Sequence, residues 1–422
     1  MSATNTASTK KPLYLLFTAN AISGFSQGLS MLAIPWYFAR QNQSSTFTFA
    51  YGIITVIVLF FGLYAGTLVD RFSRKKNFLA VNIICGILLF SIALSGYYFQ
   101  SIQPFWVIAV FGITLLNYNI HYPTLYAFAH EITEPTEYQR VNSWIEIVGQ
   151  STSILSGALA AILLDGVDPS VSKLAGFHLN LHINIPRWEI WEVFMLDAST
   201  YFIAVILIAN IKYTPHKHVT IELGSVYKRV QTGFTYLKAN RSLLIFGFFS
   251  YSVFAALLVC IHSLLPIYVE KHLNENGSVF AAADLIYAIG ALGAGLFVGK
   301  VFASTQSVKA IIWLTFLASA LFLWAFLSQQ VWIIYVFCLL MGFSNAGIRV
   351  LRLTYFFQHI PNEVMGRVNS IFNMSNVLTR SIFIFLFSVP FFTTGHQIVW
   401  AFLIVSVYLA FSAAILWKVK DK

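Results

Sequence analysis

The stretch GTLVDRFSRKK, Gly66–Lys76, sets four cations and one carboxylate between two long apolar runs. The run that precedes it, ITVIVLFFGLYAG, shows none of the alternation between apolar and polar residues that a membrane β-strand requires. A helix needs about 20 mostly apolar residues to cross a bilayer, and both runs reach that length. The stretch therefore predicts a short charged loop between two membrane-crossing helices.

The composition extends this interpretation to the whole chain. Hydrophobic residues make up 58% of the 422 residues, and charged residues only 10%. A soluble globular protein carries roughly 25% charged residues, so this chain lacks the charge to cover a water-facing surface. We expect a polytopic, all-α membrane protein.

Apolar stretches of the required length recur along the chain and predict twelve spans. The first run is too long for the core of a signal peptide and ends in no cleavage site, so we expect it to be a span. The twelve lie near residues 13–38, 48–69, 77–99, 104–129, 141–164, 190–211, 243–269, 279–299, 309–328, 331–359, 368–393 and 398–417.

The distribution of Lys and Arg predicts the orientation of these spans. With the N-terminus inside the cell, the cytoplasmic segments hold 19 of these cations, whereas the outer loops hold only Arg40, Lys173, Arg187 and Lys271. Cytoplasmic loops carry the excess of cations, so we expect both termini in the cytoplasm and the chain in the inner membrane. The net charge of +10 then reflects topology and contact with anionic lipid, and it gives no reason to expect nucleic acid as a partner.

The phrase RVNS occurs twice, at Arg140–Ser143 and at Arg367–Ser370, 227 residues apart. Each copy opens a long apolar run, the fifth span and the eleventh. Parallel repeats of this kind mark the two halves of one large class of transporters. We therefore predict two six-helix bundles, residues 1–211 and 243–422, joined by a cytoplasmic linker over 212–242. The second part of that linker is basic with helical spacing, so we expect a helix along the membrane surface.

The residue types typical of catalysis and of cofactor binding are sparse. The cysteines, Cys85, Cys260 and Cys338, all lie inside predicted spans at no metal-binding spacing, and no Walker-type phosphate loop is present. A membrane-embedded enzyme would have to use the outer loop before the sixth span, which offers His178, His182, Glu189 and Glu192 at irregular spacing. We expect no catalysis, no metal and no cofactor.

The opening stretch resembles the loop signature of the major facilitator superfamily, G-x-L-x-D-R-x-G-R-K-x, and departs from it at Ser73. The matching residues are Gly66, Leu68, Asp70, Arg71, Arg74 and Lys75. The resemblance implies a transporter of twelve spans in which Asp70 and Arg71 meet the start of the eleventh span and gate transport. We assign to the gate Gly66, Asp70, Arg71, Arg74, Arg140 and Arg367.

Three phrases are similar to the branch of macrolide-efflux and siderophore-export proteins: LVDRFSRKK, FMLDASTYFIA and FFQHIPNEVMGRVNS. This branch implies proton-coupled efflux, by antiport, of a small amphipathic molecule through a monomer. The antiporter signature expected in the fifth span, G-x-x-x-G-P-x-x-G-G, keeps Gly149 and Gly157 but lacks its proline. Proton-coupled uptake of a siderophore or of another nutrient is therefore the alternative.

Ionisable side chains inside spans are the candidates for proton coupling, because each costs about 2.5–3.5 kcal/mol at the centre of a membrane helix. We assign this role to Asp197, with Glu146 and His121. Two alternatives stay open: Asp197 pairs with an arginine of a neighbouring helix, or Glu146 only closes a capping box with Ser143.

Arginine and aromatic side chains are the candidates for substrate binding. Arg349 and Arg352 lie one turn apart on one face of the tenth span, where they either bind an anionic group or reach toward the headgroups. Aromatic faces suit a bulky amphipathic substrate. The predicted substrate-binding residues are Arg349, Arg352, Asn117, Tyr118 and Tyr126.

Overall fold

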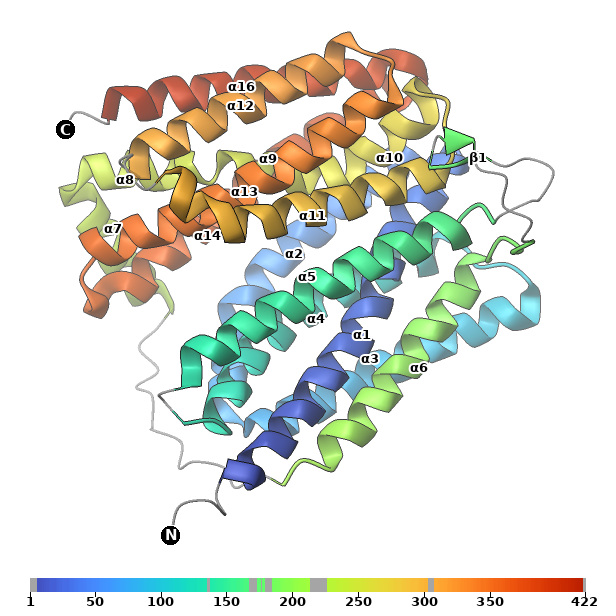
Figure 1. Cartoon of the computed structure of the whole chain (residues 1–422), viewed down its shortest axis with the longest axis horizontal. Helices are drawn as coiled ribbons and strands as arrows, with labels where there is room; N and C mark the ends of the chain where they lie inside the picture. The colour runs from blue at the N-terminus through green and yellow to red at the C-terminus, as the bar shows by residue number, and fades with distance from the viewer. Residues whose placement is uncertain are drawn as a thin grey trace. The chain divides into compact units, whose positions relative to one another are not determined.

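The computed structural model describes residues 6–134, 137–166, 173–175, 177–178, 184–212, 226–302 and 307–419, and these are almost entirely helical. Long helices succeed one another along the chain (Figure 1). They are α1 (Thr6–Arg40), α2 (Ser44–Arg71), α3 (Arg74–Phe99), α4 (Pro104–Glu131), α5 (Tyr138–Leu163), α6 (Ile190–Ala209), α11 (Gly277–Val301), α12 (Ser307–Leu327), α13 (Val331–His359), α14 (Asn362–Phe387) and α16 (Val399–Val419).

The segment predicted as the seventh span is a helix with interruptions. It consists of α8 (Arg241–Ser250), α9 (Ser252–Val259), the π-helical turn η2 (Cys260–Leu264), α10 (Leu265–Ile267) and a second π-helical turn, η3 (Tyr268–His272). The remaining elements are short: α7 (Val226–Ala239), α15 (Pro390–Thr393), the 3₁₀ turn η4 (Gly395–Ile398) and an antiparallel pair of two-residue strands, β1 (Lys173–Leu174) and β2 (Phe177–His178).

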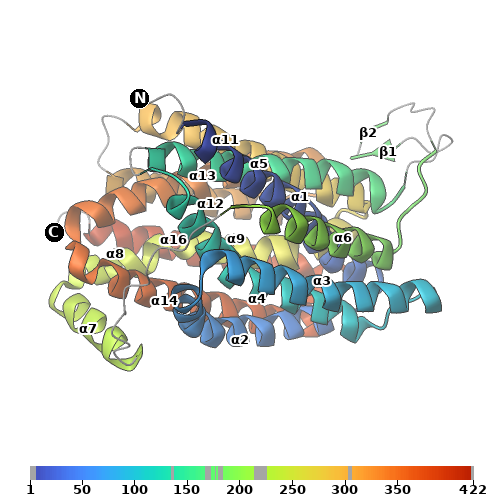
Figure 2. The same ribbon diagram turned by 90° about the horizontal axis from the view of Figure 1, so that it is seen from below.

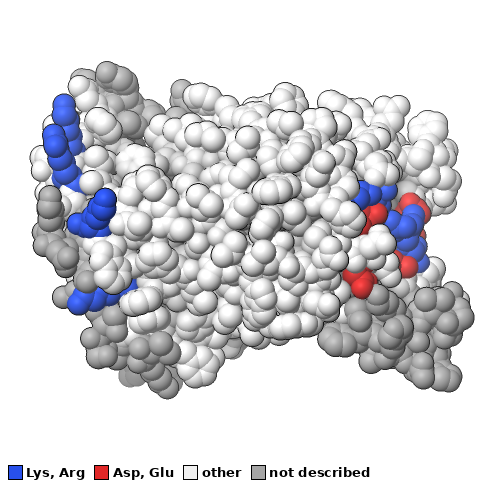
Figure 3. Space-filling model, turned by 90° about the horizontal axis from the view of Figure 1, so that it is seen from above, with Lys and Arg blue, Asp and Glu red and all other residues white. Residues whose placement is uncertain are grey.

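Ten helical segments of the described residues combine the length and the hydropathy of a membrane span. The long helices α1 and α5 are outside this set. On the face drawn in Figure 3, Lys and Arg lie near one end of the helices, charged side chains of both signs lie near the other, and a broad band between them carries no charge. The expectation of a helical, multi-pass membrane protein is confirmed, while the count of twelve spans stays a prediction.

The chain divides into two compact units. Unit 1 comprises Met1–Tyr37, Ile57–Ser172 and Leu179–Ile221, and unit 2 comprises Phe38–Val56, Lys173–His178 and Glu222–Lys422. Helix α2 is thus shared, because its first half packs within unit 2. The predicted boundaries at residues 211 and 243 stay predictions.

Small side chains allow close helix contacts within unit 1. A Cβ atom at Gly86 of α3 would lie 3.1 Å from the Cβ atom of Tyr201 of α6. Helix α1 approaches α5 in the same way, since a Cβ at Gly28 would lie 2.5 Å from Ser156 Oγ. That hydroxyl donates to the Phe25 carbonyl at 2.6 Å. Small residues and interhelical hydrogen bonds drive association in membranes, where burial of apolar surface contributes little.

In unit 2, a glycine lets one helix approach the backbone of its neighbour. Helices α11 and α13 run side by side (Figure 1). A Cβ atom at Gly342 of α13 would lie 2.9 Å from the Ala291 nitrogen and would also meet the Tyr287 carbonyl oxygen. Helices α12 and α16 are joined by reciprocal bonds, in which Ser319 and Ser406 each donate a hydroxyl to the other's carbonyl at 2.8 Å. The basic segment predicted to be helical forms α7, which packs beside α14 (Figure 2), while its position along the membrane surface stays a prediction.

Candidate functional site

The signature loop joins the ends of three helices in unit 1. The side chains of Gly66, Asp70 and Arg71 lie outside the described residues. Arg74 Nε, at the start of α3, lies 3.4 Å from Glu131 Oε1 at the end of α4. Lys75 Nζ donates to the carbonyls of residues 209 and 211, both at 2.7 Å. A cation stabilises the unpaired carbonyls at the end of a helix, so this loop fastens α3 to α4 and α6.

Each RVNS phrase contacts another helix through its asparagine. In unit 1, Asn142 Oδ1 and His130 Nε2 are hydrogen-bonded at 2.8 Å. In unit 2, the Tyr251 hydroxyl donates to Asn369 Oδ1 at 3.2 Å. Arg140 and Arg367, the arginines of the two phrases, were both assigned to the gate, and both are exposed. Sequence reasoning overlooked the asparagines, although their repetition at the same offset was the available signal.

Arg140 contacts its own helix end, where its Nη1 lies 3.3 Å from Glu137 Oε2. Both side chains are largely exposed, and an exposed pair of this kind contributes little to stability. Helix α5 begins at Tyr138, so Glu146 lies in its third turn. A capping box with Ser143 is therefore wrong, and the interpretation that placed Glu146 deeper in the helix is correct.

Asp197 is the fully buried carboxylate of unit 1. It lies on α6 with 0% of its surface exposed. Its Oδ2 accepts a hydrogen bond of 2.7 Å from Ser30 Oγ of α1, whereas Oδ1 has no hydrogen-bond partner. Among the described residues, the hydrogen-bond partner of this carboxylate is the Ser30 hydroxyl, and pairing with an arginine stays an open alternative.

Asn117 contacts Tyr201, and Tyr201 lies one turn beyond Asp197 on α6. The Asn117 Nδ2 group donates to the Tyr201 hydroxyl at 3.1 Å, and Asn117 Oδ1 is buried without a partner. Asn117 also lines a cavity of about 210 Å³ among α2, α3 and α4, whose other walls are apolar apart from Cys85. Ser30 and Tyr201 are thus part of a buried polar cluster with Asp197 and Asn117. Nothing in the local sequence around Ser30 or Tyr201 indicated this role.

His121 follows Asn117 by one turn on α4. It is 5% exposed, and its Nε2 is hydrogen-bonded to Asn20 Oδ1 of α1 at 2.9 Å. The ring packs edge to face against Phe78, with centroids 5.0 Å apart. This histidine is thus enclosed by a hydrogen-bonded amide and an aromatic ring. Helix α1 contacts two of the three candidate proton carriers, His121 and Asp197.

Three tyrosines at intervals of four residues follow one face of α4. The rings of Tyr118 and Tyr122 lie 5.6 Å apart, and the Tyr126 hydroxyl donates to Glu146 Oε1 of α5 at 2.9 Å. Tyr122 is 46% exposed. The stripe connects two predicted substrate residues with a predicted proton residue, and it adds Tyr122, which the sequence analysis did not single out despite its helical spacing.

The two arginines of α13 differ in environment. Arg349 is exposed, whereas Arg352 is 5% exposed. Arg352 Nη1 donates to the Ser250 carbonyl at 2.8 Å, and its Cζ lies 3.5 Å from the centroid of the Tyr251 ring. The side chain thus binds the break between α8 and α9. One turn before Arg349, Asn345 Nδ2 donates to the Tyr287 hydroxyl of α11 at 3.0 Å.

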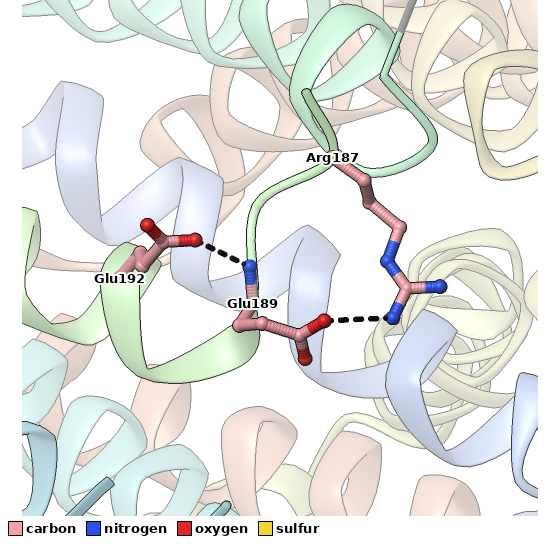
Figure 4. Close-up of polar contacts among 3 residues, drawn as sticks. All are labelled: Arg187, Glu189 and Glu192. Carbon is pink, nitrogen blue, oxygen red and sulfur yellow. Dashed lines mark hydrogen bonds and ion pairs between the residues drawn. The ribbon is translucent and has the colours of Figure 1, made fainter. Parts of the chain in front are cut away.

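The loop before α6 is organised by charged side chains (Figure 4). The Glu189 backbone N–H donates to Glu192 Oε2 at 2.7 Å, and Arg187 Nη2 lies 2.9 Å from Glu189 Oε1. Both glutamates, which the enzyme alternative would have used, therefore occupy the N-terminal turn of a helix, where carboxylates are stabilised by unpaired N–H groups. His182 lies outside the described residues.

The family of this chain follows from its match to a family model. The model of the Major Facilitator Superfamily matches residues 16–384. The chain belongs to the major facilitator superfamily. It is therefore a transporter, as the loop signature predicted, rather than an enzyme.

Relatives of this transporter belong to the predicted branch. Macrolide efflux protein A of Streptococcus pyogenes is 22% identical over 86% of the chain and 85% of its own length. The enterobactin exporter EntS of Shigella boydii is 24% identical over 86% of the chain and 81% of its own length. The resemblance to the efflux and export branch is confirmed.

Solved transporters share the fold. The nucleoside transporter NupG matches with a TM-score of 0.70 at 14% identity, covering 97% of the chain and 99% of that structure. A D-xylose–proton symporter matches with a TM-score of 0.68 at 12% identity, covering 96% of the chain and 97% of that structure. At these identities the likeness concerns the fold alone.

Proposed function

We propose that this transporter exports small amphipathic organic molecules in exchange for protons, by alternating access. The observation that supports proton exchange is the Asp197 carboxylate, which is fully buried and held by a single hydroxyl. The relatives named for macrolide efflux and enterobactin export support the outward direction. The activities in these names make a macrolide and a siderophore-like molecule the first substrates to test.

The proposal includes an architecture of twelve spans in two six-helix bundles, residues 1–211 and 243–422. The linker over 212–242 and both termini lie in the cytoplasm, and the monomer lies in the inner membrane. The cation count supports the orientation. Helices α1 and α5 complete the twelve, and their length of 35 and 26 residues is sufficient for a crossing.

We assign proton exchange to Asp197, with Glu146 and His121 as further carriers. A carboxylate at membrane depth is costly unless it is neutralised or paired. Ser30 is a suitable partner for both states, since its hydroxyl donates to the carboxylate and can accept from the protonated acid. Asn20 plays a comparable role beside His121, because its side-chain amide both donates and accepts.

The substrate contacts are assigned to Asn117, Tyr118, Tyr126, Arg349 and Arg352. The aromatic stripe on α4 supplies apolar contact without demanding one shape, which suits an amphipathic molecule.

Gating is assigned to Gly66, Asp70, Arg71, Arg74, Arg140 and Arg367. For this gate we expect Asp70→Asn to insert normally and to lower the flux strongly; a flux equal to wild type contradicts the assignment.

Flux through reconstituted protein tests the proposal. Proteoliposomes with an imposed proton gradient are loaded with a labelled macrolide or with enterobactin, and the flux is compared with and without an uncoupler. We expect gradient-driven movement against the proton flow. Movement together with the protons supports the competing function, proton-coupled uptake of a nutrient, and flux that ignores the uncoupler contradicts proton exchange.

A further inference from the structure

Arg380 is an intramembrane cation with no assigned role. It lies on α14 in the segment Val364–Phe387, which has the length and hydropathy of a membrane span. Its Nε is buried and has no hydrogen-bond partner. Among the described residues, no carboxylate pairs with this arginine, and the groups within electrostatic range are Tyr51 and His262.

The contrast with Arg352 indicates what is missing. Arg352 is buried in unit 2, whereas Arg380 is half-buried, and a carbonyl and an aromatic face satisfy the Arg352 guanidinium group. An arginine inside a span costs about 2.5–3.5 kcal/mol on insertion scales, and it is normally paired or faces a polar space. Arg380 bears this free-energy cost although its Nε has no hydrogen-bond partner in the protein. A negatively charged ligand would supply the missing partner.

A second donor lies on the same face of α14. Asn376 precedes Arg380 by one turn, and residues four apart on a helix are neighbours. Asn376 is 4% exposed, and its Nδ2 is buried without a hydrogen-bond partner. A buried donor left unpaired is itself destabilising, by about 1–3 kcal/mol. Two unsatisfied donors one turn apart match the two oxygens of a carboxylate or a similar oxyanion.

Two ring-bearing residues of unit 2, Tyr51 and His262, lie within electrostatic range of Arg380. The ring of Tyr51, on the first half of α2, packs edge to face with the His262 ring at 5.8 Å between centroids. His262 belongs to the π-helical turn η2, and single π-turns within helices are frequent at functional sites. The neighbouring Ser263 is hydrogen-bonded to Thr48 of α2 at 2.8 Å, which holds this turn against α2.

We propose that Arg380 and Asn376 form a subsite for the anionic group of an aromatic or otherwise amphipathic substrate, whose apolar part lies beside Tyr51 and His262. Arginine suits this role because its forked donors match the planar oxygens of a carboxylate. The inference deepens the proposed function and rests on it, since it names the substrate class and transfers anion recognition from Arg352 to Arg380.

Binding to the full-length protein tests the subsite without requiring transport. The protein is placed in nanodiscs of zwitterionic lipid, so that no anionic headgroup is supplied, and titrated calorimetrically with 1-naphthoate and with neutral 1-naphthamide. We expect Arg380→Gln to weaken naphthoate binding at least about tenfold and to leave naphthamide unchanged. Asn376→Leu should weaken naphthoate by a smaller factor, and Arg380→Lys should retain part of the affinity.

The control is Lys418→Gln, which removes a cation at the end of α16. Equal naphthoate affinity in wild type and Arg380→Gln overturns the subsite, and so does an equal loss of both probes, which indicates a packing role. The proposed function is judged separately by flux. If naphthoate binding depends on Arg380 while proteoliposomes transport nothing, the subsite stands and the transport proposal falls. If proteoliposomes show proton-driven flux while Arg380→Gln binds naphthoate as the wild type does, the transport proposal stands and the subsite falls.

Discussion

The two units bury charged groups of opposite sign. Unit 1 encloses the Asp197 carboxylate, which one hydroxyl contacts. Unit 2 encloses the guanidinium group of Arg352, which is held by a backbone carbonyl and an aromatic ring, and it places Arg380 in a half-buried setting in which Nε is buried. A carboxylate can gain and lose a proton, whereas an arginine keeps its charge. Among the described residues, the fully buried carboxylate therefore belongs to unit 1 and the buried arginine to unit 2.

The asparagines at corresponding positions make a finer comparison. Asn117 and Asn345 are 228 residues apart, and each donates to a tyrosine hydroxyl of a neighbouring helix. The tyrosines are not equivalent, since Tyr201 lies on the sixth long helix and Tyr287 on α11. The two units therefore retain the donor and have changed the acceptor.

The strongest test of the comparison replaces the reversible charge. Asp197→Asn keeps the shape but cannot exchange a proton, so the accelerating effect of a proton gradient on flux should disappear. Coupling between two sites commonly amounts to about 5–150-fold. Flux in proteoliposomes measures the effect, and Asp284→Asn, on α11 of unit 2, is the matched control. If Asp284 carries the effect and Asp197 does not, the assignment of the reversible charge to unit 1 is wrong.

Glycine substitutions compare the helix contacts of the two units. In unit 2, Gly342→Ala forces a methyl group against the backbone of α11, which should destabilise the protein by about 1–3 kcal/mol. In unit 1, Gly86→Ala meets side chains that can shift, so we expect a smaller loss. Thermal unfolding in detergent measures both. Gly295→Ala, where no atom lies within 4 Å of the new Cβ, should be neutral; a larger loss there than at Gly342 contradicts the packing account.

Arg352 and Arg380 should respond differently to the loss of charge. Arg352→Gln removes a hydrogen bond and a cation–π contact, which together contribute about 2 kcal/mol. Arg380→Gln removes a charge that the described residues leave unpaired, so stability should stay the same or rise. Midpoints of thermal unfolding for the two variants decide the matter, and equal losses would show that protein groups hold Arg380 as firmly as Arg352.

The smallest expected effect concerns the repeated asparagines. Asn142→Ala and Asn369→Ala each remove one hydrogen bond to another helix, so each should lower the free energy of unfolding by about 1 kcal/mol. Asn373→Ala, at an exposed position of α14, serves as the control for an asparagine substitution. A loss at one asparagine only would show that the two copies have diverged in structural role.

The sequence by itself determined the helical membrane class, the family and the repeat. These depend on hydropathy and on short motifs, which are properties of neighbouring residues: an apolar run long enough to cross the bilayer has to form its backbone hydrogen bonds internally. The loop signature at Gly66–Lys76 and the doubled RVNS were readable for the same reason.

Only the tertiary structure decided which partner each buried polar group meets. Arg352 and Arg380 look alike in sequence, as cations within apolar runs, yet Arg352 binds the Ser250 carbonyl whereas the buried Nε of Arg380 has no hydrogen-bond partner. The start of α5 decided the position of Glu146, and the π-helical turn η2 placed His262 beside Tyr51. The physical reason is that a hydrogen bond depends on the rotation and the axial register of two helices far apart in the chain, and neither is encoded in the hydropathy of one of them.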